Sequence, residues 1–275
     1  QGIKAVPFII QVPAFNGRRS EMVVSSVRPG KPLGRDFFII SLHGRVTVIQ
    51  AGDQRGDRAV AHQSNRLLLF QAAAQFAQVL EATPAHTVLV VDEAYYEYAL
   101  HDDDYPDVLA MLEARVGPWI VLRTFSKAWG LAGLRVGYGM ADSAELVGLM
   151  DKVRSPFNVN MAAQRAALAA WNDPAHMRSG VATTVALRED LRRQLLALAG
   201  PGRPLQGLRI APSVANFLFL DLGRPNAPVA EALLRQGVIV KPWKEPGFEH
   251  FLRVSIGTEG DNARFVQALL AALKV

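Results

Sequence analysis

Two short stretches of the chain decide its fold: TVLVVDE at residues 87–93 and WIVLRTFSK at residues 119–127. Each begins with a continuous apolar run and ends abruptly in charged or hydroxyl side chains. Such runs are typical of strands in a parallel sheet, which is buried on both faces. In these sheets ligands bind beyond the carboxyl ends of the strands, where Asp92 and Lys127 stand. This coincidence predicts a functional site at those two residues.

Helices and strands alternate around these runs, which is typical of an α/β sheet. Helices are predicted at residues 72–81, 143–154 and 161–171, and a third strand at residues 134–140. Nearer the N-terminus, strands are expected at residues 37–40 and 46–49, with turns at Gly30, Gly34 and Gly44.

The pattern changes after Asp173-Pro174. A long helix to about Ala199 is followed by short strands and further helices, which indicates a smaller α+β domain. Its strands are predicted at residues 208–211, 216–220, 238–240 and 252–256, and its helices at 227–236 and 262–273. We therefore expect an α/β large domain with a mostly parallel sheet, including residues 71–174, and an α+β domain over residues 175–275.

Composition excludes several classes of protein. The 275 residues include no cysteine, so disulfide scaffolds, thiolate nucleophiles and cysteine-ligated zinc are ruled out. The six histidines do not fall at metal-ligand spacing, and no metal site is expected. No apolar run approaches the roughly 18 residues that a membrane span needs.

The net charge of +5 is unevenly distributed. Residues 1–70 hold ten Lys/Arg and four Asp/Glu, whereas residues 71–275 hold twenty and twenty-one. A basic segment can bind nucleic acid. Here the basic residues are scattered among apolar ones and no aromatic RNA motif accompanies them, so no nucleic-acid partner is expected.

The stretch TFSKAWGLAGLR at residues 124–135 carries the chemical signal. A lysine between a buried strand and an apolar, glycine-rich segment loses solvation and can attack a carbonyl as the free base. The hydroxyls of Thr124 and Ser126 and the cation of Arg135 suit a phosphate. A carbonyl electrophile that carries a phosphate describes pyridoxal phosphate, and Asp92 could protonate its ring nitrogen. These residues alone leave open a surface lysine and a capping aspartate as alternatives.

Three ordered motifs resemble the fold-type-I, class I/II aminotransferases: VDEAY at residues 91–95, RTFSKAWGLAGLRVGY at 123–138 and LRVSIGT at 252–258. The stretches PSVANF at 212–217 and GVIVKP at 237–242 are most similar to the histidinol-phosphate aminotransferase subfamily. The resemblance covers about residues 72–275. It implies a pyridoxal-phosphate transferase fold with a large and a small domain, and a homodimer that acts on small amino and keto acids. The absence of cysteine is compatible with a cytoplasmic enzyme, which is the localisation we expect.

The resemblance also implies a role for each matching residue. Lys127 would be the Schiff-base lysine, with Asp92 against the ring nitrogen and Tyr95 against the ring hydroxyl. The cofactor phosphate would be held by Thr124, Ser126 and Arg135. In the small domain, Arg253 would bind the substrate carboxylate, Lys241 would lie near a distal phosphate, and Asn216 would contact the substrate. A lysine offers a point charge at position 241 where many relatives have arginine, which leaves the distal specificity open.

The implied reaction converts histidinol phosphate and 2-oxoglutarate to imidazole-acetol phosphate and glutamate, in histidine biosynthesis. An aromatic amino acid aminotransferase and a related phosphate-recognising decarboxylase are the alternatives within the same fold. The alternative of another class is an incomplete, inactive chain that at most binds pyridoxal phosphate.

Residues 1–70 show none of the motifs that the resemblance implies for the region before Asp92. Missing are an Asn-Pro-Asn-Asn-Pro-Thr-Gly segment, a glycine-containing phosphate loop and a tyrosine lent by a partner subunit. With the charge discontinuity, this predicts an atypical basic segment, such as a truncation joined to a shifted reading frame, and a chain that is poorly soluble or inactive.

Overall fold

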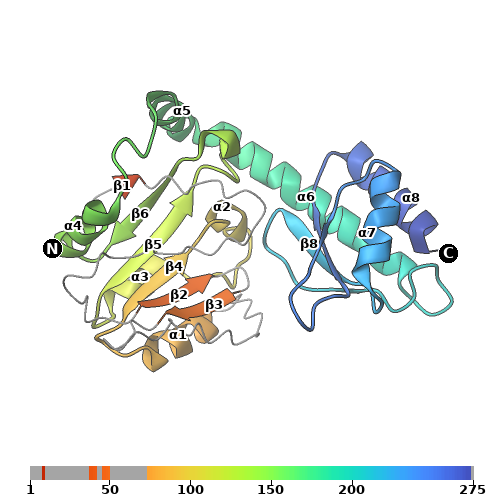
Figure 1. Cartoon of the computed structure of the whole chain (residues 1–275), viewed down its shortest axis with the longest axis horizontal. Coiled ribbons are helices and arrows are strands. Elements are labelled where there is room, and N and C mark those ends of the chain that lie inside the picture. The colour runs from red at the N-terminus through yellow and green to blue at the C-terminus, as the bar shows by residue number, and fades with distance from the viewer. Residues whose placement is uncertain (1–7, 10–36, 42–44, 50–72, 274–275) are drawn as a thin grey trace. The chain divides into compact units, whose positions relative to one another are not determined.

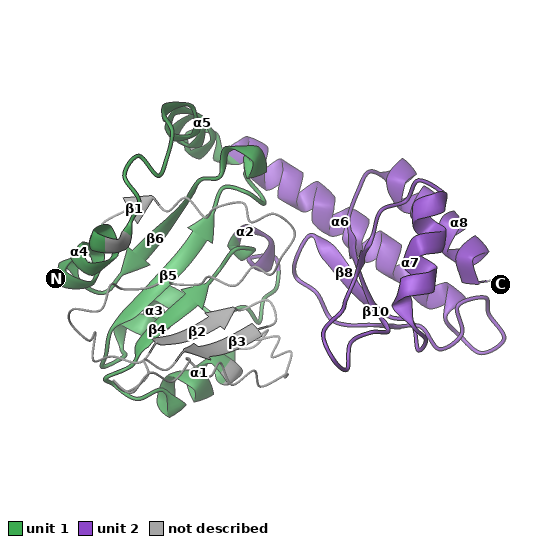
Figure 2. Ribbon diagram, in the orientation of Figure 1, with its two compact units in different colours: residues 1–96, 102–174 green, residues 97–101, 175–275 purple. Residues whose placement is uncertain are grey.

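The structure is a computed structural model that describes residues 8–9, 37–41, 45–49 and 73–273. The chain divides into two compact units (Figure 2). The first comprises residues 1–96 and 102–174, and the second comprises residues 97–101 and 175–275. Each unit has its own sheet and its own apolar core.

The sheet of the first unit has the strand order β1-β6-β5-β4-β2-β3. The central strands β2, β4 and β5 are parallel, while β6 runs antiparallel to β5, β1 antiparallel to β6, and β3 antiparallel to β2. Four of the six strands therefore share one direction, which confirms the mostly parallel α/β sheet. The strands are β1 (Phe8–Ile9), β2 (Phe37–Ser41), β3 (Arg45–Ile49), β4 (Val88–Asp92), β5 (Trp119–Thr124) and β6 (Gly137–Ala141).

Helices cover both faces of this sheet (Figure 1). Helices α1 (Ala73–Ala82) and α3 (Val108–Glu113) pack on one face, against Leu89 and Val91 of β4. Helix α4 (Ala144–Val153) packs on the other face, against Val88 and Val90. Successive strand residues alternate between the faces, so the unbroken apolar run of β4 serves two cores at once.

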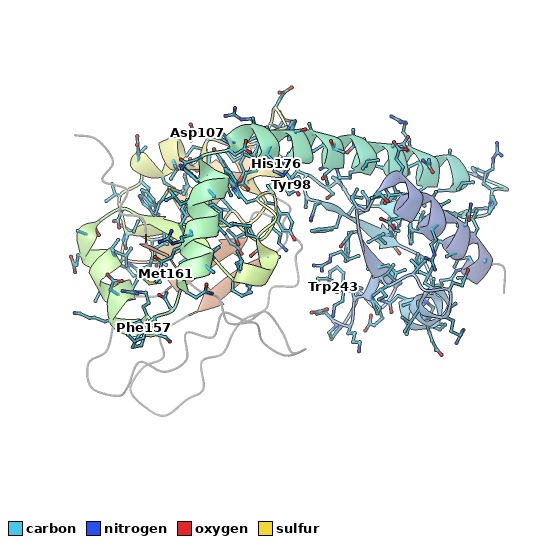
Figure 3. The ribbon with its side chains drawn as sticks, turned by 90° about the horizontal axis from the view of Figure 1, so that it is seen from above. Tyr98, Asp107, Phe157, Met161, His176 and Trp243 are labelled. Carbon is cyan, nitrogen blue, oxygen red and sulfur yellow. The ribbon has the colours of Figure 1, made fainter. Side chains whose placement is uncertain are left out.

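Short polar side chains determine where three of these helices begin. The side chains of Asp107 (Figure 3), Ser143 and Asn160 accept the N–H of the third residue after them, at the starts of α3, α4 and α5 (Met161–Trp171). Such caps satisfy N–H groups that have no partner inside the helix. A 3₁₀ turn, η1 (Ala132–Leu134), completes this unit. The short helix α2 (Tyr96–Ala99) is divided, because Tyr96 belongs to the first unit and its other three residues belong to the second.

The second unit is an antiparallel sheet of order β7-β8-β10-β9, packed against helices. Its core joins α6, α7 and α8 to the sheet through fully buried side chains such as Leu195, Leu218 and Leu252. The Nδ2 atom of Asn226 donates to the carbonyls of Trp243 and Phe251, each at 2.7 Å. The elements are α6 (Pro174–Leu198), β7 (Arg209–Ile210), β8 (Phe217–Asp221), α7 (Asn226–Arg235), β9 (Lys241–Pro242), β10 (Phe251–Ser255) and α8 (Glu259–Leu273).

Two predicted strands differ from the structure. The strand expected at residues 134–140 begins only at Gly137, because η1 precedes it and Arg135 adopts a left-handed conformation, with φ 54°. The strand expected at residues 238–240 is absent from that stretch. There the N–H of Val238 donates to Leu233 O in the end of α7, and the strand β9 follows at Lys241. The turns expected at the three glycines lie outside the described residues.

At Gly137 the backbones of β5 and β6 approach closely, so a larger side chain there should destabilise the protein. A Cβ atom there would lie 2.8 Å from Arg123 O, whereas one at Gly148, within α4, would meet nothing within 4 Å. Gly137→Ala should therefore lower the free energy of unfolding by about 1–3 kcal/mol. Gly148→Ala, the matched control, should raise it by up to about 1 kcal/mol. Urea titration measures both changes, and equal changes would contradict the prediction.

Candidate active site

The ends of two parallel strands bring the predicted residues of the first unit together. Asp92 is the last residue of β4 and lies in register with Leu122 of β5, and Thr124 ends β5 two residues later. Because side chains alternate along a strand, Asp92, Leu122 and Thr124 share one face of the sheet. This is the face that α4 covers further along the strands. The site therefore lies at the carboxyl edge of the sheet.

Asp92 is partly buried and accepts the N–H of Ala94 on Oδ1, at 3.0 Å. Burial raises the pKa of this carboxyl above its ordinary value, and the Ala94 hydrogen bond and the Lys127 ammonium oppose that rise. A buried carboxylate is stable as a charged group only when a cation or donor faces it. The side chain is thus suited to a positively charged partner.

Lys127 lies in a tight turn that follows β5. The N–H of Gly130 donates to Lys127 O at 3.0 Å, and the N–H of Leu131 donates to Phe125 O at 2.9 Å. Gly130 has a φ of 72°, which favours glycine at this position. The Nζ atom of Lys127 lies 5.1 Å from the ring centroid of Tyr95. The amine, the tyrosine and the Asp92 carboxylate therefore lie in one neighbourhood.

Hydroxyl groups and a guanidinium form the other end of this neighbourhood. Thr124 Oγ1 accepts the N–H of Ser126 at 3.0 Å, and Arg135 Nη1 donates to Ser126 Oγ at 3.1 Å and to Ala132 O at 2.9 Å. Arg135 holds this position from a left-handed backbone, which costs roughly 1–2 kcal/mol in a non-glycine residue. A strained cation beside two hydroxyls is suited to an anion such as a phosphate.

Aromatic side chains that the sequence interpretation did not single out pack behind the Lys127 turn. The ring of Phe125 lies 5.5 Å from Trp129, 5.8 Å from Tyr138 and 6.2 Å from Trp171. The Trp129 and Trp171 rings stack at 5.5 Å. Trp171 comes from the end of α5, so this cluster ties the turn to a helix some forty residues away. The aromatic residues inside the motif were a signal, but their partner in α5 was not.

A second group missed by the sequence interpretation lies on the opposite face of the sheet. The carboxylate of Glu93 is fully buried, and Arg123 binds it through Nε and Nη2, each 2.8 Å from Oε2. The Tyr105 hydroxyl donates to Oε1 at 2.7 Å. The Arg123 Cζ atom lies 3.3 Å from the centroid of the Tyr96 ring. Both charged residues flank site residues in the sequence, which is the signal that could have found them.

The three predicted substrate residues all lie in the second unit. Arg253 of β10 is in register with Lys241 of β9, so the two cations share one face of the small sheet. The Arg253 Cζ atom lies 5.3 Å from the Phe217 ring centroid, and Lys241 is exposed. Asn216 precedes β8, and its carbonyl accepts the N–H of Ile256 at 2.9 Å. The roles of these residues stay predictions, as do those in the first unit.

Comparison with known proteins identifies the class of protein that this fold and site define. The sequence model for aminotransferase class I and II matches residues 72–269. The chain belongs to this family.

Within this family, the chain is similar to two curated histidinol-phosphate aminotransferases. The chain is 48% identical to histidinol-phosphate aminotransferase 3 of Rhizobium meliloti (strain 1021), over 91% of this chain and 69% of that protein. It is 42% identical to histidinol-phosphate aminotransferase 1 of Mesorhizobium japonicum, over 90% and 68% respectively. A solved histidinol-phosphate aminotransferase from Sinorhizobium meliloti, in complex with pyridoxal-5'-phosphate, superimposes with a TM-score of 0.64 at 26% identity. That match covers 74% of this chain and 53% of the solved one, so the chain spans about half of that protein's length.

These alignments also show how far residues 1–70 resemble known relatives. The family match begins at residue 72, whereas a match over 91% of the chain must include part of residues 1–70. That the segment is atypical stays a prediction. Among the residues that the structure describes, no helix is long and apolar enough to cross a membrane, and no group of three or more acidic or histidine side chains could hold a metal ion.

The raised pKa of Asp92 predicts how stability depends on pH. In the folded state this carboxyl binds its proton more tightly than the ordinary value of 3.8 implies, so ionising it at higher pH costs folding free energy. Asp92→Asn should therefore raise the free energy of unfolding of the ligand-free protein at pH 7. It should also reduce the loss of stability as pH rises above about 4, leaving the part due to Glu93, whose pKa burial also raises.

Urea titrations between pH 4 and 8 measure this effect. Asp107→Asn is the matched control, because Asp107 is exposed and an asparagine can also cap α3. It should change stability little. A less stable Asp92→Asn protein at pH 7 would show that the Asp92 charge stabilises the fold.

Proposed function

We propose that this protein is a pyridoxal-phosphate-dependent transaminase, and specifically a histidinol-phosphate aminotransferase. The observation that carries the proposal is the grouping of Lys127, Asp92 and the Ser126–Arg135 pair at one edge of the sheet. The named relatives at 48% and 42% identity support the specific reaction. In that reaction, histidinol phosphate and 2-oxoglutarate give imidazole-acetol phosphate and glutamate.

The donor set fits pyridoxal phosphate group by group. An amine at Lys127 matches the aldehyde, a carboxylate at Asp92 matches the ring nitrogen, and Tyr95 is near enough to the amine to bind the ring hydroxyl. The hydroxyls of Thr124 and Ser126 with the Arg135 guanidinium match the phosphate. When bound, the cofactor supplies an electron sink for the bond that breaks at the substrate α-carbon.

The chain's own residues would then perform the proton chemistry. Lys127 Nζ would take the proton from the substrate α-carbon as a general base and return it as a general acid. Asp92 would keep its negative charge against the protonated ring nitrogen, because that cation offsets the cost of burial. Arg253 would bind the substrate carboxylate, Lys241 the distal phosphate, and Asn216 would contact the substrate.

We propose a homodimer, located in the cytoplasm. Large apolar side chains are exposed on α5 and just before it, and such a group of residues is typical of a surface that a partner covers. Phe157 is 97% exposed and Met161 71% exposed (Figure 3), and Leu168 and Trp171 continue the group along the same helix.

Replacing the lysine tests the proposed chemistry directly. Lys127→Ala should abolish the visible absorbance that pyridoxal phosphate acquires on covalent binding and its incorporation after borohydride reduction. Transamination should fall by roughly 10²–10⁴-fold or more. Lys152→Ala, at an exposed lysine of α4, is the matched control and should behave as the wild type.

The wild type separates the alternatives. Bound cofactor that bleaches with glutamate supports the transaminase, and bound cofactor that does not react indicates a chain that only binds it. Retention of a reducible adduct in Lys127→Ala would disprove the assignment of the lysine.

The proposed distal phosphate predicts a selective loss at Lys241. Lys241→Ala should raise the KM for imidazole-acetol phosphate by roughly tenfold or more, and leave that for a non-phosphorylated aromatic keto acid nearly unchanged. The wild-type KM for the phosphorylated substrate should also rise with salt. Lys244→Ala, at a neighbouring exposed lysine, serves as the control. Equal effects on both substrates would favour an aromatic aminotransferase.

A further inference from the structure

The buried Glu93–Arg123 ion pair is the strongest feature that the proposed reaction does not use. Both oxygens of Glu93 are engaged, Oε2 by Arg123 and Oε1 by the Tyr105 hydroxyl. The side chain of Arg123 is only 10% exposed. The charges are therefore neutralised within the protein and are not directed at solvent.

This pair joins the two strand ends that carry the candidate site. Glu93 directly follows Asp92 at the end of β4, and Arg123 directly precedes Thr124 at the end of β5. The N–H of Glu93 also donates to Leu122 O at 2.8 Å, so main chain and side chain link the same two strands. The ring of Tyr96 lies against the Arg123 guanidinium. Tyr96 directly follows Tyr95, so the ion pair also contacts the segment that carries this site residue.

The pair cannot itself touch a ligand bound beside Asp92. Arg123 alternates with Leu122 and Thr124 along β5, so it lies on the face occupied further along by Val121, Leu89 and α3. Asp92 and Thr124 lie on the other face. Glu93 can therefore act on the site only through the backbone or through its charge, which adds to the rise in the pKa of Asp92.

General stability is a weak reason for such a pair. Removing two charges from water costs about as much as their attraction returns, and well-packed apolar residues often serve equally well. A geometric role fits the contacts better. Two hydrogen bonds from Arg123 to Glu93 Oε2 join the two neighbouring strand ends, and the Tyr105 hydroxyl fixes the other carboxylate oxygen.

We infer that Glu93 and Arg123 are positioning residues, which fix the ends of β4 and β5 so that Asp92 and the turn bearing Lys127 keep their mutual placement. The consequence for a bound cofactor rests on the proposed function, whereas the placement itself does not. Two amides report on it without any ligand: Ala94 N–H, which Asp92 Oδ1 accepts, and Ser126 N–H, which Thr124 Oγ1 accepts.

The test compares Glu93→Gln and Arg123→Lys in the full chain with two controls. Glu113→Gln makes the same substitution at an exposed position of α3. Leu112→Ala removes a fully buried side chain from α3, which packs on the same face of the sheet, and lowers stability without changing either member of the ion pair. Hydrogen exchange at Ala94 and Ser126, urea unfolding, and the pH midpoint of the absorbance of bound pyridoxal phosphate are measured for each.

Glu93→Gln and Arg123→Lys should accelerate exchange at both amides by roughly tenfold or more beyond the acceleration in Leu112→Ala. Arg123→Lys, which keeps both charges, should also shift the pH midpoint, which Leu112→Ala and Glu113→Gln should leave in place. If exchange in both ion-pair variants only follows the loss of stability, as in Leu112→Ala, the inference is overturned. If Glu93→Gln does not fold, Arg123→Lys decides alone, since it keeps the charge and removes the planar fork.

The two proposals fail in different ways. A wild type that takes up no pyridoxal phosphate overturns the proposed function, while hydrogen exchange still decides the positioning role. A wild type that binds and reacts, together with unchanged exchange in both variants, overturns the positioning role alone.

Discussion

The parallel pairing of β4 with β5 is the constraint on which the candidate site depends. Its register places Asp92 opposite Leu122, and from this follow the positions of Thr124 and of the turn that carries Lys127. Parallel strands end at the same edge of a sheet, so residues more than thirty positions apart become neighbours without any contact specific to the site. A slip of one residue would exchange the faces and move Asp92 to the side of α1 and α3.

The two faces at this edge have different tasks. One presents Asp92 and Thr124, and beside them the turn with the Lys127 amine and the Ser126–Arg135 pair. The other holds Glu93, Arg123 and two tyrosines in a closed group of hydrogen bonds and ring contacts. The strict alternation of a strand allows adjacent residues to serve these separate purposes. Charged residues at consecutive positions therefore need not share a function.

Much of this arrangement could be predicted from the sequence. The apolar runs identified β4 and β5, and the helix predicted at residues 161–171 matches α5, which begins after the capping side chain of Asn160. The strand predicted at residues 134–140 began too early, since no propensity rule anticipates an arginine in a left-handed conformation at 135. The strand predicted at residues 238–240 was wrong because the N–H of Val238 bonds back to Leu233 O of α7, and the strand begins only at Lys241.

The Glu93–Arg123 pair and the Phe125–Trp171 contact were missed for one physical reason. Both join segments that only the tertiary structure brings together, so no local pattern contains them.

The costs of the structure are concentrated at the candidate site. Asp92 places a carboxylate where burial opposes its charge, Arg135 adopts a left-handed backbone, and Glu93 and Arg123 give up hydration. The apolar cores on both faces of the sheet offset these costs, since each fully buried large side chain contributes about 1.5–3 kcal/mol. The aromatic contacts of Phe125 add about 0.5–1.5 kcal/mol each, directly beneath the turn. The backbone around Lys127 is thereby held against the sheet while its amine stays beside Tyr95. An amine that reacts with a carbonyl and then transfers a proton needs both a fixed backbone and an accessible side chain, and Lys127 has both.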